Sequence, residues 1–253
     1  MATAADILRF INTVAPFDSQ MSWDNSGLLI GDSDCVAEQI GLCLDITHRT
    51  ITAAKQCGAN VIVSHHPVIF SPLKSVTAGS VQYELIRSGI TAICAHTNFD
   101  LAVGGVNDML TRVLGLKNVT PLDDGNALPL GRIGDTDKDY TPENFARRVR
   151  NSLGCGRVRL VPGVTPIKRA AVCGGAGADL LTVAAKNGAD ALVTGEAKHH
   201  ELLLADELGI TLIDAGHFST EHPAIYALKS QLEARFPYIC TTVLEEADPA
   251  QYI

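Results

Sequence analysis

Histidine is the residue type whose placement along this chain most clearly suggests chemistry. Seven of the eight histidines follow short apolar runs: His65, His66, His96, His199, His200, His217 and His222. Those runs have the length and composition of buried strands. Because ligands of open α/β sheets bind outside the carboxyl ends of the strands, this placement indicates a binding site at those ends.

Two carboxylates, Asp100 and Glu221, lie in the same post-strand segments. Neutral imidazole and carboxylate are the usual ligands of zinc, iron, manganese and similar divalent ions. The candidate ligand set is therefore His65, His66, Asp100, His217 and Glu221. Adjacent side chains on a strand diverge, so we expect His65 and His66 to hold different, neighbouring ions. A carboxylate can bridge two such ions.

The last candidate segment contains a proline that limits where its helix can begin. His217 and Glu221 are four residues apart, which on a helix would place both on one face. Pro223, however, is tolerated only within the first helical turn. We therefore expect His217 in the loop and Glu221 at the helix start, with Ser219 or Thr220 as the N-cap.

Other polar residues near strand ends favour structural roles. Three histidines are expected to be surface or packing residues: His48, His199 and His222. Asp45 and Thr47 are expected to cap the helix that follows them. The glycine-rich segment 173–177 could cradle an anion with its backbone N–H groups, but it lacks the GxGxxG spacing and a tight turn is favoured. The sequence contains no GxSxG, P-loop, HExxH or catalytic-cysteine motif.

The apolar runs and the segments between them predict a repeated strand–helix–strand–helix–strand plan. Strands are predicted at residues 40–44, 61–63 and 91–94, and again at 170–173, 191–193 and 211–213. Gly58 and Gly188 stand where a left-handed residue commonly ends a helix. We predict an internal duplication, giving two similar α/β lobes with mostly parallel sheets flanked by helices.

A segment rich in proline, glycine and aspartate, residues 121–134, marks the boundary between the lobes. It gives a first lobe of residues 1–125 and a second lobe of residues 126–253. Thr141 and Pro142 are expected to open a helix that runs to about Leu153. A C-terminal helix of about residues 224–253 is expected to pack back on the first lobe.

Composition and charge exclude several classes of protein. The chain of 253 residues is 46% hydrophobic, which is too apolar for a disordered protein. Its net charge of −8 opposes binding to nucleic acid or anionic membranes, although a bound metal could still attract a small anionic substrate. No apolar stretch reaches the roughly 20 residues that cross a bilayer. The N-terminal segment has the pattern of a first helix, not of a signal peptide.

Cysteine usage favours a reducing, cytoplasmic compartment. The chain has seven cysteines, an odd number, with no CxxC pair. Cys43, Cys94 and Cys173 lie within apolar runs, where we expect reduced thiols that pack as small hydrophobic groups.

At the candidate residues the sequence resembles the dinuclear metal-centre proteins, also called NIF-three-like proteins or GTP cyclohydrolase I type 2 homologues. Five stretches carry the resemblance, and with the elements between them they cover nearly the whole chain: WDNSGLL at 23–29, VIVSHHPVIF at 61–70, AHTNFDLAVGGVND at 95–108, VTGEAKHHE at 193–201 and DAGHFSTE at 214–221.

The resemblance implies a two-lobed protein that assembles as a toroidal homohexamer with two divalent ions per subunit. By motif match the ligands would be His65, His66, Asp100, His217 and Glu221, with Glu221 as a bridge between the ions. His96 and His200 match positions that recur near the family site, so they are candidates for contact with substrate. The role of Glu196 is left open.

Two functions fit these residues and this resemblance. The favoured one is a metal-dependent hydrolase that acts on a nucleotide-like or phosphorylated small molecule, with His96 or His200 as general acid or base. The other is a metal-stabilised ring protein with a regulatory or partner-binding role and no catalysis. Imidazole and carboxylate accept zinc, iron, manganese or nickel, so the sequence does not select the metal.

Overall fold

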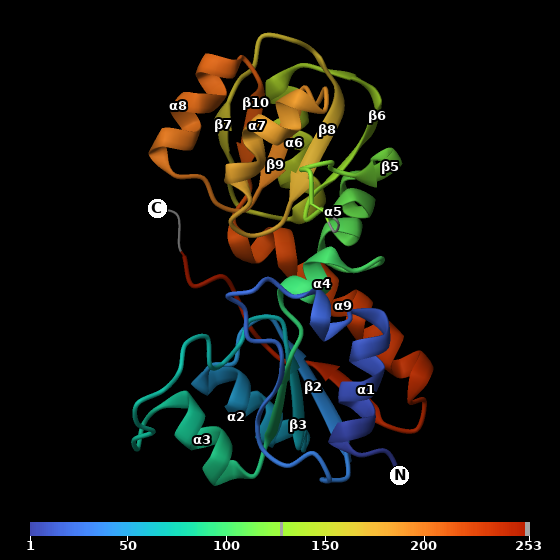
Figure 1. Cartoon of the computed structure of the whole chain (residues 1–253), viewed down its shortest axis with the longest axis vertical. Helices are drawn as coiled ribbons and strands as arrows, with labels where there is room; N and C mark the ends of the chain where they lie inside the picture. The colour runs from blue at the N-terminus through green and yellow to red at the C-terminus, as the bar shows by residue number, and fades with distance from the viewer. Residues whose placement is uncertain (127–128, 251–253) are drawn as a thin grey trace. The chain divides into compact units, whose positions relative to one another are not determined.

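The computed structural model describes residues 1–126 and 129–250, which form two compact α/β units (Figure 1). The first unit comprises Met1–Gly105 and Ile225–Ala247, and the second comprises Val106–Ala224 and the segment from Asp248. The predicted lobe boundary lies between residues 125 and 126, whereas the units divide after Gly105 and again after Ala224. Residues 127–128 of the predicted boundary segment and 251–253 of the predicted C-terminal helix lie outside the described residues.

The first unit is built on a five-stranded sheet with the order β1-β4-β3-β2-β11. Its strands are β1 (Gly27–Ile30), β2 (Gln39–Cys43), β3 (Val61–Ser64), β4 (Thr91–Cys94) and β11 (Cys240–Val243). All neighbours run parallel except the edge strand β1, which pairs antiparallel with β4. Cys43, Ser64 and Cys94 pair across β2, β3 and β4, so the residues after these strands lie along one sheet edge.

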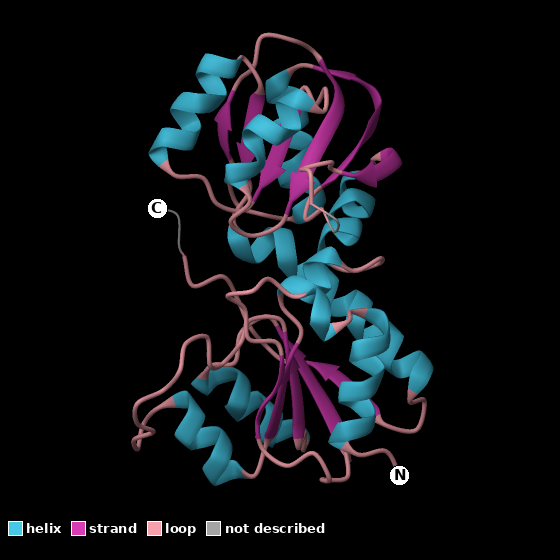
Figure 2. Cartoon of the chain, viewed as in Figure 1, coloured by secondary structure: helices cyan, strands magenta, loops and turns pink. Residues whose placement is uncertain are grey.

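Helices cover both faces of this sheet (Figure 2). The helices that belong to the first unit in whole or in part are α1 (Ala4–Val14), η1 (Phe17–Ser19), α2 (His48–Cys57), α3 (Val81–Ser88), α4 (Thr97–Leu101) and the later part of α9 (His217–Arg235). On one face Ile51 of α2 and Leu85 of α3 pack in a core cluster with Ile62 of β3. On the other face α1 lies beside α9 (Figure 1). Phe10 of α1 packs edge-on against Phe236, which follows α9, with ring centroids 5.7 Å apart.

The second unit is built on a six-stranded sheet with the order β5-β6-β8-β9-β10-β7. Its strands are β5 (Lys117–Pro121), β6 (Arg132–Tyr140), β7 (Arg159–Val161), β8 (Ile167–Cys173), β9 (Ala191–Thr194) and β10 (Thr211–Asp214). The central strands β8, β9 and β10 are parallel, whereas β5, β6 and β7 pair antiparallel. Cys173, Thr194 and Asp214 align at the carboxyl ends of the parallel strands.

Alternation along β8 divides the core of the second unit into two layers. Its helices are α5 (Val106–Leu114), α6 (Pro142–Leu153), η2 (Ala178–Leu180), α7 (Leu181–Lys186) and α8 (His199–Leu208), with the first residues of α9. Val172 lies in one buried cluster with Phe145 of α6, whereas the adjacent Ala171 lies in the other with Leu181 of α7. Successive residues of a strand point to opposite faces, which produces this division.

The six predicted strands are all present, and the mixed α/β class with two helix-flanked sheets is confirmed. Strands β2–β4 and β8–β10 follow the repeated plan. Thr141 caps α6 as predicted, and Gly58 ends α2 with a positive φ of 80°. Strands β1, β5, β6, β7 and β11 were not predicted. Every residue of β5 is exposed.

The C-terminal helix is shorter than predicted. Helix α9 ends at Arg235, and strand β11 follows and pairs parallel with β2. Thr241, Thr242 and Val243 are β-branched, a residue type that favours strands over helices. Among the described residues, no helix is both long enough and apolar enough to cross a membrane.

The cysteines lie in environments that differ strongly in accessibility. All seven are free thiols, with Cys43, Cys94 and Cys173 buried and Cys240 exposed. Burial raises the pKa of the Cys43 and Cys94 thiols well above the ordinary value. The expectation that the three thiols in apolar runs pack as hydrophobic groups is therefore confirmed for the folded chain.

We predict that a thiol-alkylating reagent labels the folded protein at Cys240 long before it labels the three buried cysteines. Alkylation requires both access and thiolate, and burial removes both. Peptide mass spectrometry at neutral pH, with and without denaturant, measures the order of labelling. Rapid labelling of Cys43 or Cys94 without denaturant would contradict the prediction.

Candidate metal centre

Three histidines of the first unit cluster at the carboxyl edge of its sheet. His65 and His66 are the first two residues after β3, and His96 is the second residue after β4. Each offers one ring nitrogen, and these nitrogens lie within 4.8 Å of one another. The aligned ends of two adjacent parallel strands bring the rings together.

Hydrogen bonds orient the rings of His65 and His66. The Nδ1 atom of His65 lies 2.9 Å from the carbonyl oxygen of Ala95, and Nδ1 of His66 lies 2.8 Å from Oδ1 of Asp45. A carbonyl or carboxylate oxygen only accepts, so Nδ1 carries the hydrogen in each ring and donates it. Each neutral ring then presents Nε2 as its lone-pair atom, which is the form that binds metals.

His96 is held in the same way by Asp24, whose side chain is fully buried. The Nδ1 atom of His96 donates to Oδ1 of Asp24 at 2.8 Å, and the backbone N–H of Thr97 donates to Oδ2 at 3.0 Å. Burial acts to raise the pKa of Asp24, but the hydrogen bonds from His96 and Thr97 outweigh it and hold this pKa far below the usual range. Asp24 therefore stays an anion beside His96.

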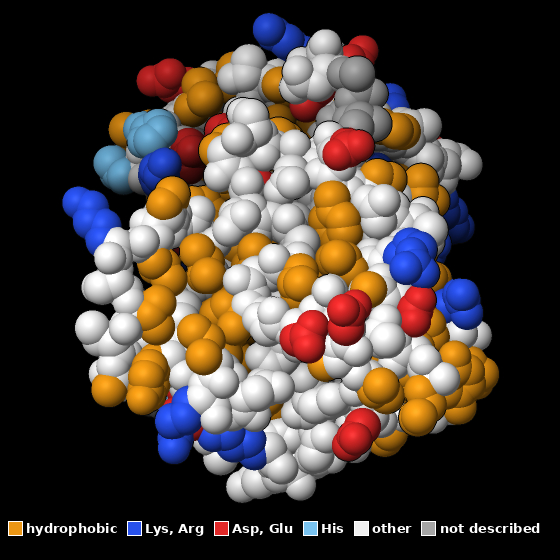
Figure 3. Space-filling view, turned by 60° about the horizontal axis from the view of Figure 1, so that its bottom comes forward, with side chains coloured by type: hydrophobic (Ala, Val, Ile, Leu, Met, Phe, Trp, Pro, Cys, Tyr) orange, Lys and Arg blue, Asp and Glu red, His pale blue; other side chains and the backbone are white. Residues whose placement is uncertain are grey.

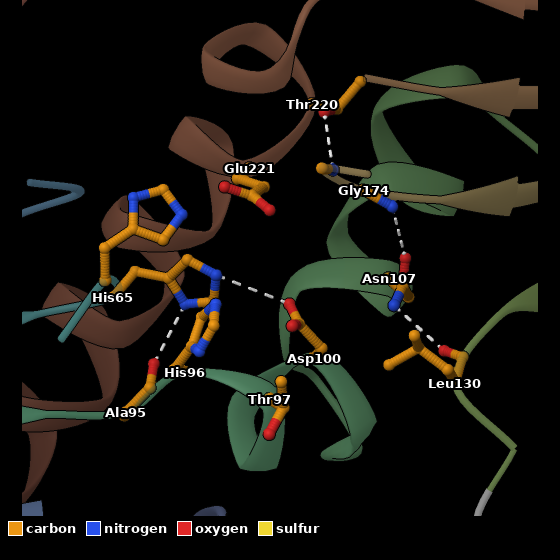
Figure 4. A network of polar contacts seen from close by, with 12 residues as sticks. His65, Ala95, His96, Thr97, Asp100, Asn107, Leu130, Gly174, Thr220 and Glu221 are labelled. Atoms are coloured by element: carbon orange, nitrogen blue, oxygen red, sulfur yellow. Dashed lines mark hydrogen bonds and ion pairs between the residues drawn. The ribbon is translucent and has the colours of Figure 1, made fainter. Parts of the chain in front are cut away.

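Asp100 reaches the cluster from the short helix α4. Phe99 is buried and Asn98 donates to the carbonyl oxygen of Ala15 at 2.7 Å, so the residues that precede this carboxylate are anchored. Oδ1 of Asp100 lies 3.5 Å from Nε2 of His65 (Figure 4). With Nδ1 protonated, both of these atoms carry lone pairs, and a cation between them would stabilise the arrangement. His65, His66, His96 and Asp100 are called the first half-site below.

The second unit brings together His217 and Glu221 at the start of α9. Nε2 of His217 lies 3.1 Å from Oε2 of Glu221, and Nδ1 of His217 lies 3.2 Å from Oε2 of Glu196. Glu196 follows β9 and thus orients His217 as Asp45 orients His66. Glu221 is buried, whereas His217 is partly exposed. His217 and Glu221 are called the second half-site below.

The expectation that His217 lies in a loop is wrong. Helix α9 begins at His217 and contains Pro223 within it, which places His217 and Glu221 on one helical face. The hydroxyl of Thr220 donates to the carbonyl oxygen of Gly216 or His217, at 3.1 and 2.9 Å. Side-chain bonding of this kind to the preceding turn often accompanies bent helices, as does an internal proline.

The glycine-rich segment after β8 is a tight turn whose N–H groups bond within the protein. Gly174 N–H donates to Oδ1 of Asn107 at 2.8 Å (Figure 4), and Gly175 N–H donates to Oγ1 of Thr220 at 3.1 Å. Gly177 N–H donates to Oγ1 of Thr194 at 3.0 Å. These bonds use the donors that an anion cradle would need, and they support the start of α9.

Gly175 makes room for the second half-site. Its φ is +61°, and a Cβ atom at this position would lie 2.2 Å from Oε1 of Glu221 and 3.2 Å from Nε2 of His217. Gly195 has a similar role, since a Cβ there would lie 2.7 Å from Cα of His217. These two glycines allow α9 to start against the loops that follow β8 and β9.

The remaining candidates lie outside both half-sites. The side chain of His200 is 74% exposed on α8, and the preceding residue His199 is also exposed. His48 bonds the carbonyl oxygen of Gly79 at 3.1 Å, and His222 stacks on Phe218 at 4.5 Å. Thr47 caps α2, as expected, by accepting from Thr50 N–H.

The residues that orient the ligands were not predicted from the sequence. Asp45 was expected to cap a helix, and Glu196 was given no role. Both residues follow strands, and this position was the signal that could have identified them. Asp24 precedes β1, and the sequence marked it only as part of the WDNSGLL stretch at residues 23–29. Gly175 lies in a segment whose pattern suggested only an anion cradle or a tight turn.

The donor chemistry of the described residues fits divalent transition metals. The first half-site offers three imidazoles and a carboxylate, and the second offers an imidazole and a carboxylate. Imidazole rings held by carboxylate or carbonyl acceptors are typical of metal ligands. The described residues could therefore bind metal, whose identity and number the donor types alone do not select.

Comparison with known proteins identifies relatives along almost the whole chain. A family model described as Duf34/NIF3 (NGG1p interacting factor 3) matches residues 2–249. A Clostridium perfringens protein named GTP cyclohydrolase 1 type 2 homolog is 31% identical over 98% of each chain. A Helicobacter pylori protein named GTP cyclohydrolase 1 type 2 is 32% identical over 95% of this chain and 96% of the relative. The crystal structure of a Staphylococcus aureus hypothetical protein, 32% identical, covers 99% of both chains with a TM-score of 0.92.

We predict that Gly175→Ala destabilises the protein by about 1–3 kcal/mol more than Gly154→Ala. Both positions have φ near +60°, so both variants carry the left-handed backbone penalty of about 1–2 kcal/mol. A Cβ at Gly175 would clash with the side chain of Glu221, whereas a Cβ at Gly154 would meet nothing within 4 Å. Urea unfolding of the two variants measures the difference. Equal losses would show that the contact with Glu221 is unimportant.

We predict that Asp24→Asn lowers the free energy of unfolding by about 3 kcal/mol, because hydrogen bonds to a charged group contribute about 1.5–3 kcal/mol each. The asparagine side chain has an NH2 group in place of one carboxylate oxygen of Asp24. This NH2 group would face N–H groups, such as those of His96 and Thr97, that now donate to the carboxylate. Asp18→Asn, outside both half-sites, is the control and should change stability by less than about 0.5 kcal/mol. Chemical denaturation checks both. A loss no larger than that of the control would contradict the role assigned to Asp24.

Proposed function

The chain belongs to the Duf34/NIF3 family, and we propose that its two half-sites jointly hold two divalent metal ions and that the protein is a metal-dependent hydrolase. Its substrate would be a nucleotide-like or phosphorylated small molecule. One observation carries the proposal: four histidines each donate Nδ1–H to an oxygen and so present Nε2 as the lone-pair atom. The names of the Clostridium and Helicobacter relatives support a reaction on a nucleotide.

The proposed ligands are the five residues expected from the sequence: His65, His66, Asp100, His217 and Glu221. Neither half-site alone has enough donors to saturate two ions, since a closed zinc site takes four ligands. Five ligands for two ions would give each ion few protein ligands and would leave coordination positions for substrate and water. Glu221 has two carboxylate oxygens and is the proposed bridge.

A bound divalent cation supplies Lewis acidity and lowers the pKa of coordinated water to about 7. The residues of the chain position the reactants. Asp45 and Glu196 hold the rings of His66 and His217, and the buried Asp24 holds His96. We assign the general acid–base role to His96 in preference to His200, because His96 lies in the histidine cluster and Asp24 holds its ring in place.

The proposal includes the assembly and the location expected from the sequence. We propose a toroidal homohexamer in the cytoplasm, supported by the family membership and by seven free thiols. Acidic and basic side chains lie interspersed on the face drawn in Figure 3, and the net charge is −8. These charges support a small-molecule substrate over nucleic acid.

We predict that His66→Ala and Glu221→Gln each lower metal affinity at least tenfold and reduce hydrolysis at least a hundredfold. His199→Ala is the control, because His199 is exposed on α8 and should leave both unchanged. Elemental analysis gives the metal content. A panel of GTP, other nucleotides and phosphomonoesters, assayed with metal-replete protein, gives turnover.

Turnover that persists in both variants would contradict the assigned ligands. Protein that binds metal but hydrolyses no member of the panel would contradict the hydrolase. If removal of metal then dissociates the ring or lowers the melting temperature, the second function, a metal-stabilised ring protein with a regulatory or partner-binding role, takes its place. Light scattering measures the assembly.

A further inference from the structure

Two exposed aromatic side chains lie beside the histidine cluster of the first unit. Trp23 is 58% exposed and Phe70 is 54% exposed. Their ring centroids are 5.8 Å apart, and they lie 6.1 and 6.4 Å from the ring centroid of His96. Exposed apolar groups that adjoin one another often mark a binding surface.

The backbone that carries both rings is held by hydrogen bonds. Asp24, next to Trp23, accepts hydrogen bonds from His96 and Thr97. Asn25 donates from Nδ2 to the carbonyl oxygen of Ile69 at 2.6 Å, and Ile69 precedes Phe70. The two loops are thus joined to each other, and one of them is joined to the histidine cluster. Rings that are exposed on a restrained backbone are arranged before a ligand arrives, which lowers the entropy cost of binding.

We propose that Trp23 and Phe70 stack against a planar heteroaromatic ring of the substrate, such as a nucleobase, and thereby determine specificity. This inference rests on the proposed function and narrows its substrate class to molecules that carry a base. Aromatic side chains stack on the π-face of any base, and each such contact contributes substantially to affinity. The neighbouring His96 places this stacking surface at the edge of the first half-site.

The composition of the chain provides a direct test, because Trp23 is its only tryptophan. Fluorescence of the metal-replete protein, excited at a wavelength that tryptophan absorbs and tyrosine does not, therefore reports on this ring alone. Guanosine 5′-monophosphate should quench the emission saturably. Ribose 5-phosphate, which has the sugar and phosphate but no base, should bind at least tenfold more weakly and leave the emission unchanged.

Variants separate stacking from other effects. Phe70→Ala should weaken guanosine 5′-monophosphate binding about tenfold, and Phe70→Tyr should restore it, because one base–aromatic stack corresponds to roughly that factor. Tyr238→Ala is the matched control, since Tyr238 is 68% exposed in the same unit. Calorimetry with Trp23→Leu should show a similar loss without a change in metal content.

Equal affinity for the two ligands, or unchanged affinity in Phe70→Ala, would overturn the inference. Trp23 emission that shifts with protein concentration in the absence of ligand would also overturn it, because a second copy of the chain would then cover the pair. Metal content measured on the same samples separates this inference from the proposed function. Wild-type protein without bound metal contradicts the metal centre, whereas full metal content with no base preference contradicts only the stacking.

Discussion

The hydrogen bond from histidine Nδ1 to an oxygen acceptor is the interaction on which both half-sites depend. An imidazole has two nitrogens and can rotate, and one such bond determines which nitrogen presents its lone pair and where it points. The acceptors for His65, His66 and His217 each follow a neighbouring strand. Ala95 follows β4 and Asp45 follows β2, on either side of the strand that leads into His65 and His66. Glu196 follows β9, the neighbour of the strand that leads into His217.

The two units use the same plan for different purposes. Ser64 ends β3 and Thr194 ends β9. The next residue is His65 in the first unit and Gly195 in the second. The imidazole at this position offers a ring nitrogen that could bind a metal. The glycine at the equivalent position leaves the space in which α9 begins. The first unit therefore has most of the imidazole nitrogens of the proposed ligand set, and the second has a helix that carries a buried carboxylate.

Much of this arrangement could be predicted because it follows from periodicity. Short apolar runs predicted β2–β4 and β8–β10. Among the histidines that follow such runs, His65, His66 and His96 cluster, whereas His199 and His200 are exposed on α8. Asp24 could not be found in this way, because β1 is antiparallel and its starting end, not its finishing end, lies beside His96. The position of His217 was misjudged because Pro223 was expected within the first helical turn, whereas α9 begins at His217 and contains the proline further in. The exposed edge strand β5 has no sequence signal of burial.

The pairing of β11 with β2 has a consequence for biosynthesis. Residues 106–224, which form most of the second unit, are inserted within the first, and β11 lies at residues 240–243. A chain that leaves the ribosome from its N-terminus must therefore expose one edge of β2 until β11 has been made. The inserted unit has all its strands available earlier, so the part of the protein that is begun first is the part that is completed last.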